Sequence, residues 1–296
     1  MPAAVRPPRA YGHRQESGSR FCLAGKVSIC NDLYMTMPEA QWRPGDPVAA
    51  AEKLMLGSAA SGQTFDGFNA LPPAESEGSH AQGNHATVRA EVLRHLLTAD
   101  DWPVDPKGVQ LRRVRISGLL DLERVTVRCP LGLTDCDLDD SRPVIANFAT
   151  IPLLILRRCR LAGFAGDSIA VTGNLTFSES HFAGAVVVSG ARIGGALQCS
   201  GTRIGANARG YSLSGHGMNV RLSVHVNRGF VCDGAIVMHR AEIGGEFICQ
   251  GARLGVNEYG MSLEGPGIRV GGALYLSEEF SAQGQYGWQE RTSGDS

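Results

Sequence analysis

The chain has 296 residues, of which 43% are hydrophobic and 19% charged, enough apolar material for one elongated domain or two compact ones. Its formal net charge of −1 favours neither nucleic acid nor an anionic membrane surface as a partner. The 38 glycines follow no collagen triplet, and no apolar run approaches the roughly 18–20 residues that span a bilayer. We therefore expect a cytoplasmic protein with no transmembrane segment and no direct nucleic-acid binding.

The first 46 residues contain basic positions but lack the apolar region of a secretory signal. Met35 and Met37 offer alternative starts to Met1. We expect residues 1–46 to be a disordered leader or to include a mis-assigned start.

Residues 47–107 carry two patterns of helical period. Residues 47–64 are rich in Ala and Leu, and residues 85–100 contain an apolar stripe for which Thr87 or Asn84 can supply the N-cap. A stretch rich in Gly, Pro and Ser separates them and predicts a loop. We expect this segment to form a small helical cap over the next domain.

After Gly108 a nine-residue signature recurs, with Ile or Val at its third position, often Gly at its fifth, and apolar residues at its seventh and ninth. The copies begin at residues 114, 169, 191, 218, 241 and 268, and the last five starts are 22, 27, 23 and 27 residues apart. Residues 191–230 and 241–280 share 16 identities in 40 ungapped positions. Internal repetition is therefore the strongest signal in the chain.

A period of 22–27 residues with strand-like alternation is typical of one coil of a parallel β-solenoid. Inward side chains then stack on equivalent positions of the next coils, so that Ile193, Leu197 and Cys199 lie in the same columns as their equivalents fifty residues later. Glycine recurs because the chain turns a corner every few residues, and some corners require positive φ.

Five-residue words within this region resemble those of the pentapeptide-repeat family. They are CDLDD (136–140), CRLAG (159–163), ARIGG (191–195), TRIGA (202–206) and ARLGV (252–256). The resemblance implies a mainly β fold, a right-handed parallel β-helix over residues 108–280, with the first and third residues of each word pointing inward. The wider pattern is similar to a group of actinobacterial proteins often named oxidoreductase or membrane-associated oxidoreductase.

The apolar alternation fades beyond residue 280, and we expect residues 281–296 to be a disordered tail. An uncovered last coil exposes strand edges and apolar core. We therefore expect end-to-end homodimerisation, or an ill-ordered end with a tendency to aggregate.

The glycine clusters and cysteines favour architecture over chemistry. No lysine follows a glycine pair as a P-loop requires, and no dinucleotide fingerprint is complete. Cys199 and Cys249 should lie two coils apart, roughly 10 Å, which is too far for a disulfide or for shared zinc ligation. We predict structural cysteines and no catalytic, cofactor-binding or metal-binding residues.

Outward polar positions form the candidate interaction surface. The acidic run at 134–142 supplies Asp135, Asp137 and Asp139, which share a face if this segment is one strand. The candidate basic positions are Arg192, Arg203 and Arg209.

The sequence favours a non-catalytic β-solenoid scaffold or protein-interaction module with an unknown protein partner. Two alternatives stay open: an enzyme, either redox-active as the resemblance implies or acting on polysaccharide, and a regulator of a nucleic-acid enzyme such as gyrase. The regulators of this family mimic DNA with an acidic surface, whereas residues 108–296 carry 18 Arg against 17 Asp and Glu.

Overall fold

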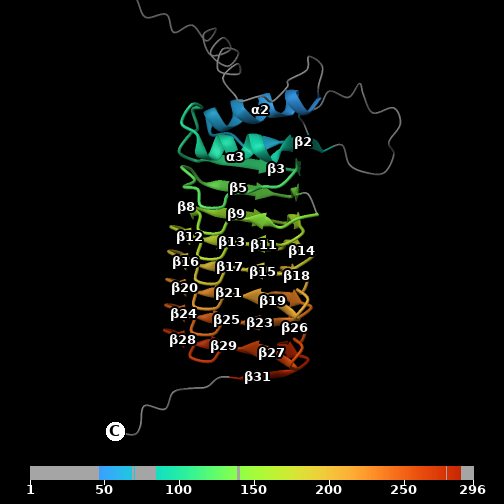
Figure 1. Cartoon of the computed structure of the whole chain (residues 1–296), viewed down its shortest axis with the longest axis vertical. Helices are drawn as coiled ribbons and strands as arrows, with labels where there is room; N and C mark the ends of the chain where they lie inside the picture. The colour runs from blue at the N-terminus through green and yellow to red at the C-terminus, as the bar shows by residue number, and fades with distance from the viewer. Residues whose placement is uncertain (1–46, 69, 71–84, 139–140, 278, 288–296) are drawn as a thin grey trace, which may run out of the picture. The chain divides into compact units, whose positions relative to one another are not determined.

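Short parallel strands stack as the coils of a β-solenoid, which confirms the predicted fold class (Figure 1). A computed structural model describes residues 47–68, 70, 85–138, 141–277 and 279–287 of the chain. The predicted leader, residues 1–46, lies outside the described residues, as do residues 288–296 of the predicted tail.

The solenoid has four sides, and from β5 onward successive coils contribute strands to them in the order A, B, C, D, whereas the two coils before β5 contribute named strands to faces A and B alone. Face A is β1 (Phe65–Asp66), β3 (Val109–Arg112), β5 (Leu131–Thr134), β9 (Leu154–Arg157), β13 (Leu175–Thr176), β17 (Leu197–Gln198), β21 (Val224–His225), β25 (Phe247–Ile248) and β29 (Leu274–Tyr275). Face B is β2 (Ala86–Arg89), β4 (Val114–Ser117), β6 (Asp137–Leu138), β10 (Arg160–Leu161), β14 (His181–Phe182), β18 (Arg203–Ile204), β22 (Val231–Cys232), β26 (Arg253–Leu254) and β30 (Ser281–Ala282). Face C is β7 (Val144–Ile145), β11 (Phe164–Ala165), β15 (Val186–Val187), β19 (Tyr211–Ser214), β23 (Ala235–Val237), β27 (Met261–Glu264) and β31 (Gln285–Gly287). Face D is β8 (Thr150–Ile151), β12 (Ala170–Val171), β16 (Arg192–Ile193), β20 (Asn219–Val220), β24 (Glu242–Ile243) and β28 (Arg269–Val270).

The strand register confirms the repeat that the sequence predicts. On face D the third residues of the last five copies pair in one column, and these are Val171, Ile193, Val220, Ile243 and Val270. The copy at 114–122 differs, because its Ile116 pairs with Leu138 on face B. All four faces need an inward apolar residue close to a turn, so the short pattern alone does not identify a face.

The alternation between coils of about 22 and 27 residues has a local cause. Each longer coil inserts a turn between faces B and C, closed by an asparagine whose side-chain oxygen accepts backbone N–H groups. Asn207 Oδ1 accepts from Arg209 N at 2.9 Å and Tyr211 N at 3.1 Å. Asn257 Oδ1 accepts from the N–H groups of Tyr259 and Met261 in the same way. The insertion therefore lengthens the period, and the strand that follows it rejoins face C through a register shift, between Tyr211 and Leu213 in one coil and between Met261 and Leu263 in the other.

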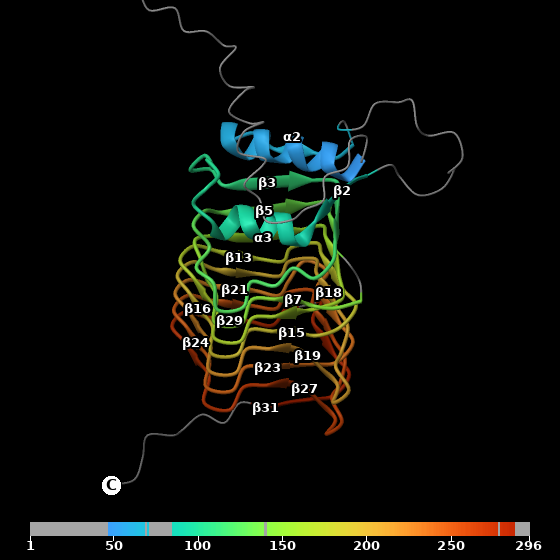
Figure 2. The ribbon, with the colours of Figure 1, turned by 45° about the horizontal axis from the view of Figure 1, so that its top comes forward.

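The helices occupy different parts of the N-terminal end (Figure 2). Helix α2 (Pro47–Ser61) lies across the end of the solenoid and packs on β1, β2 and β3, as the predicted cap requires. Helix α3 (Ala90–Thr98) follows β2 directly and takes the place of a face C strand in the first coil, where Arg94 Nε donates to Asp121 O at 2.7 Å. Its N-cap residue is Arg89, so the predicted cap at Thr87 is wrong, because Thr87 belongs to β2.

The core is a set of inward columns that run the length of the solenoid. The first and third residues of all five words that resemble pentapeptide repeats are buried, as predicted. Phe164, Phe177 and Phe182 fill the middle coils, with ring centroids 5.0 and 5.3 Å apart in edge-to-face contact. The columns therefore provide one continuous core rather than a separate core for each repeat.

The C-terminal coil is more exposed than the coils before it. Strands β30 and β31 continue the solenoid to Gly287, past the predicted boundary at residue 280. Val270 and Leu274 are partly exposed there, whereas Ile243 and Phe247, one coil earlier, are buried. The last strand of each face also has no described neighbour on its outer edge.

We expect this end to associate with the same end of a second copy, because both would cover open strand edges and apolar side chains. Sedimentation velocity should then show a concentration-dependent dimer. Leu274→Asp should raise the dimer dissociation constant at least about tenfold. Leu222→Asp, on an exposed leucine at the side of the solenoid, is the matched control. A monomer at every concentration, with the last coil protected from hydrogen exchange, would contradict this expectation.

Candidate functional site

The corner between faces A and B, called the A–B corner below, turns through a residue with positive φ in successive coils. Four consecutive coils place Arg113, Asp135, Arg158 and Glu179 there, with φ of 51, 55, 50 and 61°. Non-glycine residues rarely adopt this conformation, so packing and side-chain contacts must hold it. The next coil has Gly201 at the same position.

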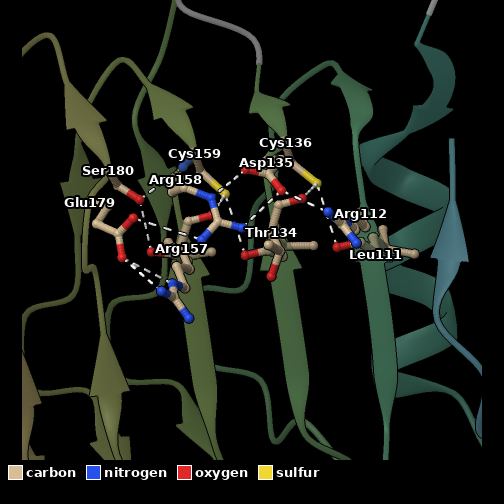
Figure 3. A network of polar contacts seen from close by, with 12 residues as sticks. Leu111, Arg112, Thr134, Asp135, Cys136, Arg157, Arg158, Cys159, Glu179 and Ser180 are labelled. Carbon is tan, nitrogen blue, oxygen red and sulfur yellow. Dashed lines mark hydrogen bonds and ion pairs between the residues drawn. The ribbon is translucent and has the colours of Figure 1, made fainter. Parts of the chain in front are cut away.

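Small hydrogen-bond donors line the inner side of the A–B corner (Figure 3). Ser180 Oγ donates to Leu156 O in the preceding coil at 2.9 Å and accepts from Cys159 N at 2.9 Å. The equivalent side chains donate to the equivalent carbonyls, Cys159 Sγ to Leu133 O at 3.4 Å and Thr202 Oγ1 to Phe177 O at 2.8 Å. A buried backbone carbonyl needs a donor, which explains why Cys, Ser and Thr occupy this inward position.

Charged side chains of alternating sign line the outer side of the same corner (Figure 3). Arg158 forms two hydrogen bonds with Asp135, at 2.6 and 3.0 Å, and its Nη1 lies 3.8 Å from Glu179 Oε2. Arg112 Nε lies 3.5 Å from Asp135 Oδ2, and Arg157 Nη2 donates to Glu179 Oε1 at 2.8 Å. Equivalent positions are one coil apart, so alternation of sign avoids the repulsion that a column of like charges would create.

This ladder shifts the protonation of its carboxylates. The hydrogen bonds from Arg158 hold the pKa of Asp135 below its usual value, against the opposing effect of burial. Arg113 lowers the pKa of Asp66, its partner in the first coil, in the same way. Both carboxylates therefore stay ionised at neutral pH and act as fixed structural charges.

A polar groove of about 550 Å³ runs along face A beside this corner. Its floor is the outward row Thr176, Gln198 and His225, from three successive coils. Arg157 and Arg228 lie at its two ends, so the residues that line the groove come from four coils. Burial lowers the pKa of His225, opposed by Glu246 and reinforced by Arg228. The imidazole is therefore mainly neutral at pH 7 and lines the groove as a polar group.

The acidic residues of the predicted interaction surface lie apart. Asp135 is at the A–B corner, and its positive φ turns the chain before Asp137, which begins β6 on face B. The two carboxylates therefore do not share a strand face as predicted. Asp137 lies 4.0 Å from Arg160, and Asp139 lies outside the described residues.

The basic residues of that surface point to three different sides. Arg192 is on face D, beside a hollow of about 500 Å³, and Arg203 is on face B. Arg209 is in the inserted turn between faces B and C. All three are exposed and form no ion pair with other described residues. The structure does not gather the predicted residues into one site.

Sequence reasoning missed the groove residues Arg157, Glu179 and Arg228. One usable signal was present, in the words RRVR (112–115), TDCD (134–137), RRCR (157–160) and SESH (178–181). The charge of the second residue alternates from one word to the next at the spacing of one coil, which predicts the ladder of charges at the A–B corner. Nothing comparable in the sequence marks the groove itself.

The described cysteines are all buried and unpaired, in agreement with a structural role. Burial raises the pKa of Cys199 and of Cys232 to about 12. Their thiols are therefore unreactive at neutral pH. Within the described ranges, no three His, Cys, Asp or Glu side chains gather as metal ligands, and neither helix is long and apolar enough to cross a bilayer.

Comparisons of the chain with protein-family models, with curated proteins and with solved structures found no match.

Ser180→Ala should lower the free energy of unfolding by about 1–3 kcal/mol, because Leu156 O and Cys159 N both lose their partner in the core. Ser180→Cys should recover part of this loss, since the two preceding coils use cysteine at the same position. Urea denaturation measures both, and Ser178→Ala, on an outward side chain two residues away, is the control. Equal losses for the alanine and cysteine variants would contradict the donor role.

Asp135→Asn should reduce stability at pH 7, because it removes the negative charge between two arginines. Asparagine tolerates positive φ, so the substitution isolates the charge. A carboxyl with a depressed pKa stabilises the fold above its unfolded pKa, near 4, and this contribution is lost as the pH falls through the lower folded value. The difference in denaturation midpoint should therefore shrink below about pH 4. A difference that does not change with pH would contradict the ion-pair argument, and Asp137→Asn is the control.

Proposed function

We propose that the protein is a non-catalytic binding scaffold that holds its partner on the outward side chains of face A and the A–B corner. The observation that carries this proposal is that the potentially reactive side chains are ion-paired or buried within the fold. Asp135 and Glu179 are paired with arginines, His239 Nε2 lies 3.0 Å from Glu264 Oε2, and Cys199 is buried. These contacts within the fold give each of these groups a structural role.

The contrast between inward and outward positions supports the same proposal. The inward residues Cys199 and Cys249 are identical in the two most similar repeats, and both are buried. The outward residue that precedes each of these cysteines differs between the two coils, because it is Gln198 in one and Ile248 in the other. Outward side chains can therefore serve recognition while the core columns keep the fold.

The two alternative functions have less support. A redox enzyme that works through its thiols would need an accessible one, and the described thiols are buried. An acidic mimic of DNA would need a face of negative charge, whereas the outward row of face B has Arg115, Arg160, Arg203 and Arg253 against Asp137. A polysaccharide-cleaving enzyme would need convergent carboxylates, and Glu179, the carboxylate of the groove, is paired with Arg157.

Site-specific photo-crosslinking in the native host tests the scaffold. A photoreactive residue in place of Gln198, on face A, should give a defined crosslinked product, identified by mass spectrometry. The same residue in place of Asn219, an outward position on face D, should not give that product. Identical products from both positions, or consumption of the bound molecule by the purified protein, would contradict the proposal.

A further inference from the structure

Two side-chain amides in the groove of face A are oriented by neighbouring hydroxyls. Thr176 Oγ1 donates to Gln198 Oε1 at 3.0 Å, and Ser200 Oγ donates to Asn227 Oδ1 at 2.6 Å. Each amide oxygen therefore accepts one hydrogen bond from a neighbouring hydroxyl, which orients the amide. The NH₂ groups of the two amides remain for an acceptor from outside.

The charges of the groove also favour an acceptor. Arg228 lies at the A–B corner with φ of 51°, and its exposed guanidinium forms no ion pair with the described residues. Gly201 occupies the same corner one coil earlier, so no side chain from that position covers Arg228. Arg157 neutralises Glu179 at 2.8 Å. The groove thus presents one unpaired cation and no unpaired carboxylate among its lining residues.

The shape of the groove suits a chain rather than a compact ligand. Its lining residues come from four successive coils, which are spaced about 4.8 Å apart along the axis. This spacing is close to the length of one sugar ring in an extended polysaccharide. Face A continues past His225 to Tyr275, but Tyr275 Oη donates to Glu246 Oε1 at 3.4 Å, so that part of the face presents a carboxylate and lies outside the groove.

We propose that this groove binds a linear acidic polysaccharide, with its carboxylate on Arg228 and its hydroxyl oxygens on the amides of Gln198 and Asn227. The inference rests on the proposed scaffold function and assigns its ligand. Sparse charge distinguishes this ligand from nucleic acid, because each nucleotide carries a phosphate and usually meets several cations and stacking aromatics. One unpaired arginine over four coils matches a polymer with a single carboxylate for every few sugars.

Isothermal titration with defined probes tests the assignment. The probes are a hexasaccharide of alternating glucuronate and neutral amino sugar, the neutral hexasaccharide of β-1,4-linked glucose, and single-stranded oligothymidylate. The acidic hexasaccharide should bind at least about tenfold more tightly than the neutral one, the loss expected for one charge-assisted contact. If oligothymidylate binds more tightly than the acidic hexasaccharide, the ligand is nucleic acid and the polysaccharide assignment is wrong. If none of the probes binds, the groove is not a binding site for either class of polymer.

Matched variants locate the binding on face A. Arg228→Gln should weaken binding of the acidic hexasaccharide about tenfold and leave the neutral probe unchanged. Gln198→Glu, which places a carboxylate at nearly constant shape, should act in the same direction. Arg240→Gln is the control, because Arg240 is also exposed at positive φ, 55°, at the corner between faces C and D. Equal losses for Arg228→Gln and Arg240→Gln would overturn the assignment, provided that thermal unfolding shows both variants folded.

The same samples separate failure of this inference from failure of the scaffold function. Mass spectrometry of the hexasaccharide after incubation reports cleavage. Binding with cleavage would contradict the scaffold and keep the groove as the ligand site. Lack of binding would contradict the polysaccharide assignment alone, and the scaffold function would still be tested by the photo-crosslinking experiment.

Discussion

The stacking of each residue on its equivalent, one coil spacing away, is the constraint on which this structure depends. At about 4.8 Å, like side chains meet along every column. Apolar columns gain from this contact and form the core, whereas charged columns are stable when the sign alternates. The A–B corner shows both solutions within a few residues, because Asp135 separates Arg113 from Arg158 outside while Cys159 and its equivalents line the inside.

The same close stacking explains one class of repeated glycine, the GG pairs, whereas Gly201, Gly210 and Gly217 and their equivalents fifty residues later have positive φ, as the predicted corners require. A Cβ on Gly194 would lie 2.2 Å from Thr172 O, and one on Gly244 would lie 2.3 Å from Arg221 O. These glycines open the GG pairs of the two most similar repeats and do not have positive φ. They allow one coil to approach the next. At the A–B corner positive φ is adopted by glycine in two coils, Gly201 and Gly251, and by charged residues such as Asp135 in others, where ion pairs hold them in place.

This division between columns separates stability from recognition. The inward and corner positions carry the fold, so the outward row of face A is free to vary from coil to coil. Thr176, Gln198 and His225 differ in chemistry although their backbones are equivalent. The backbone of the repeat is regular, but its outward side chains differ from coil to coil, so the groove presents a hydroxyl, an amide and an imidazole in one row.

The sequence by itself determined the coil, its period and its inward residues, because strand alternation and repetition are local properties that stacking preserves. The apolar residues at 193, 197 and 199 show this, since all are buried as predicted. Only the tertiary structure decided which face each outward residue occupies. Arg157 and Arg228 are 71 positions apart and line one groove, whereas Asp135 and Asp137 are near neighbours that point to different sides. The positive φ of Asp135 separates the two aspartates, and the stacking of successive coils brings the two arginines together; neither effect can be located from the residue types alone.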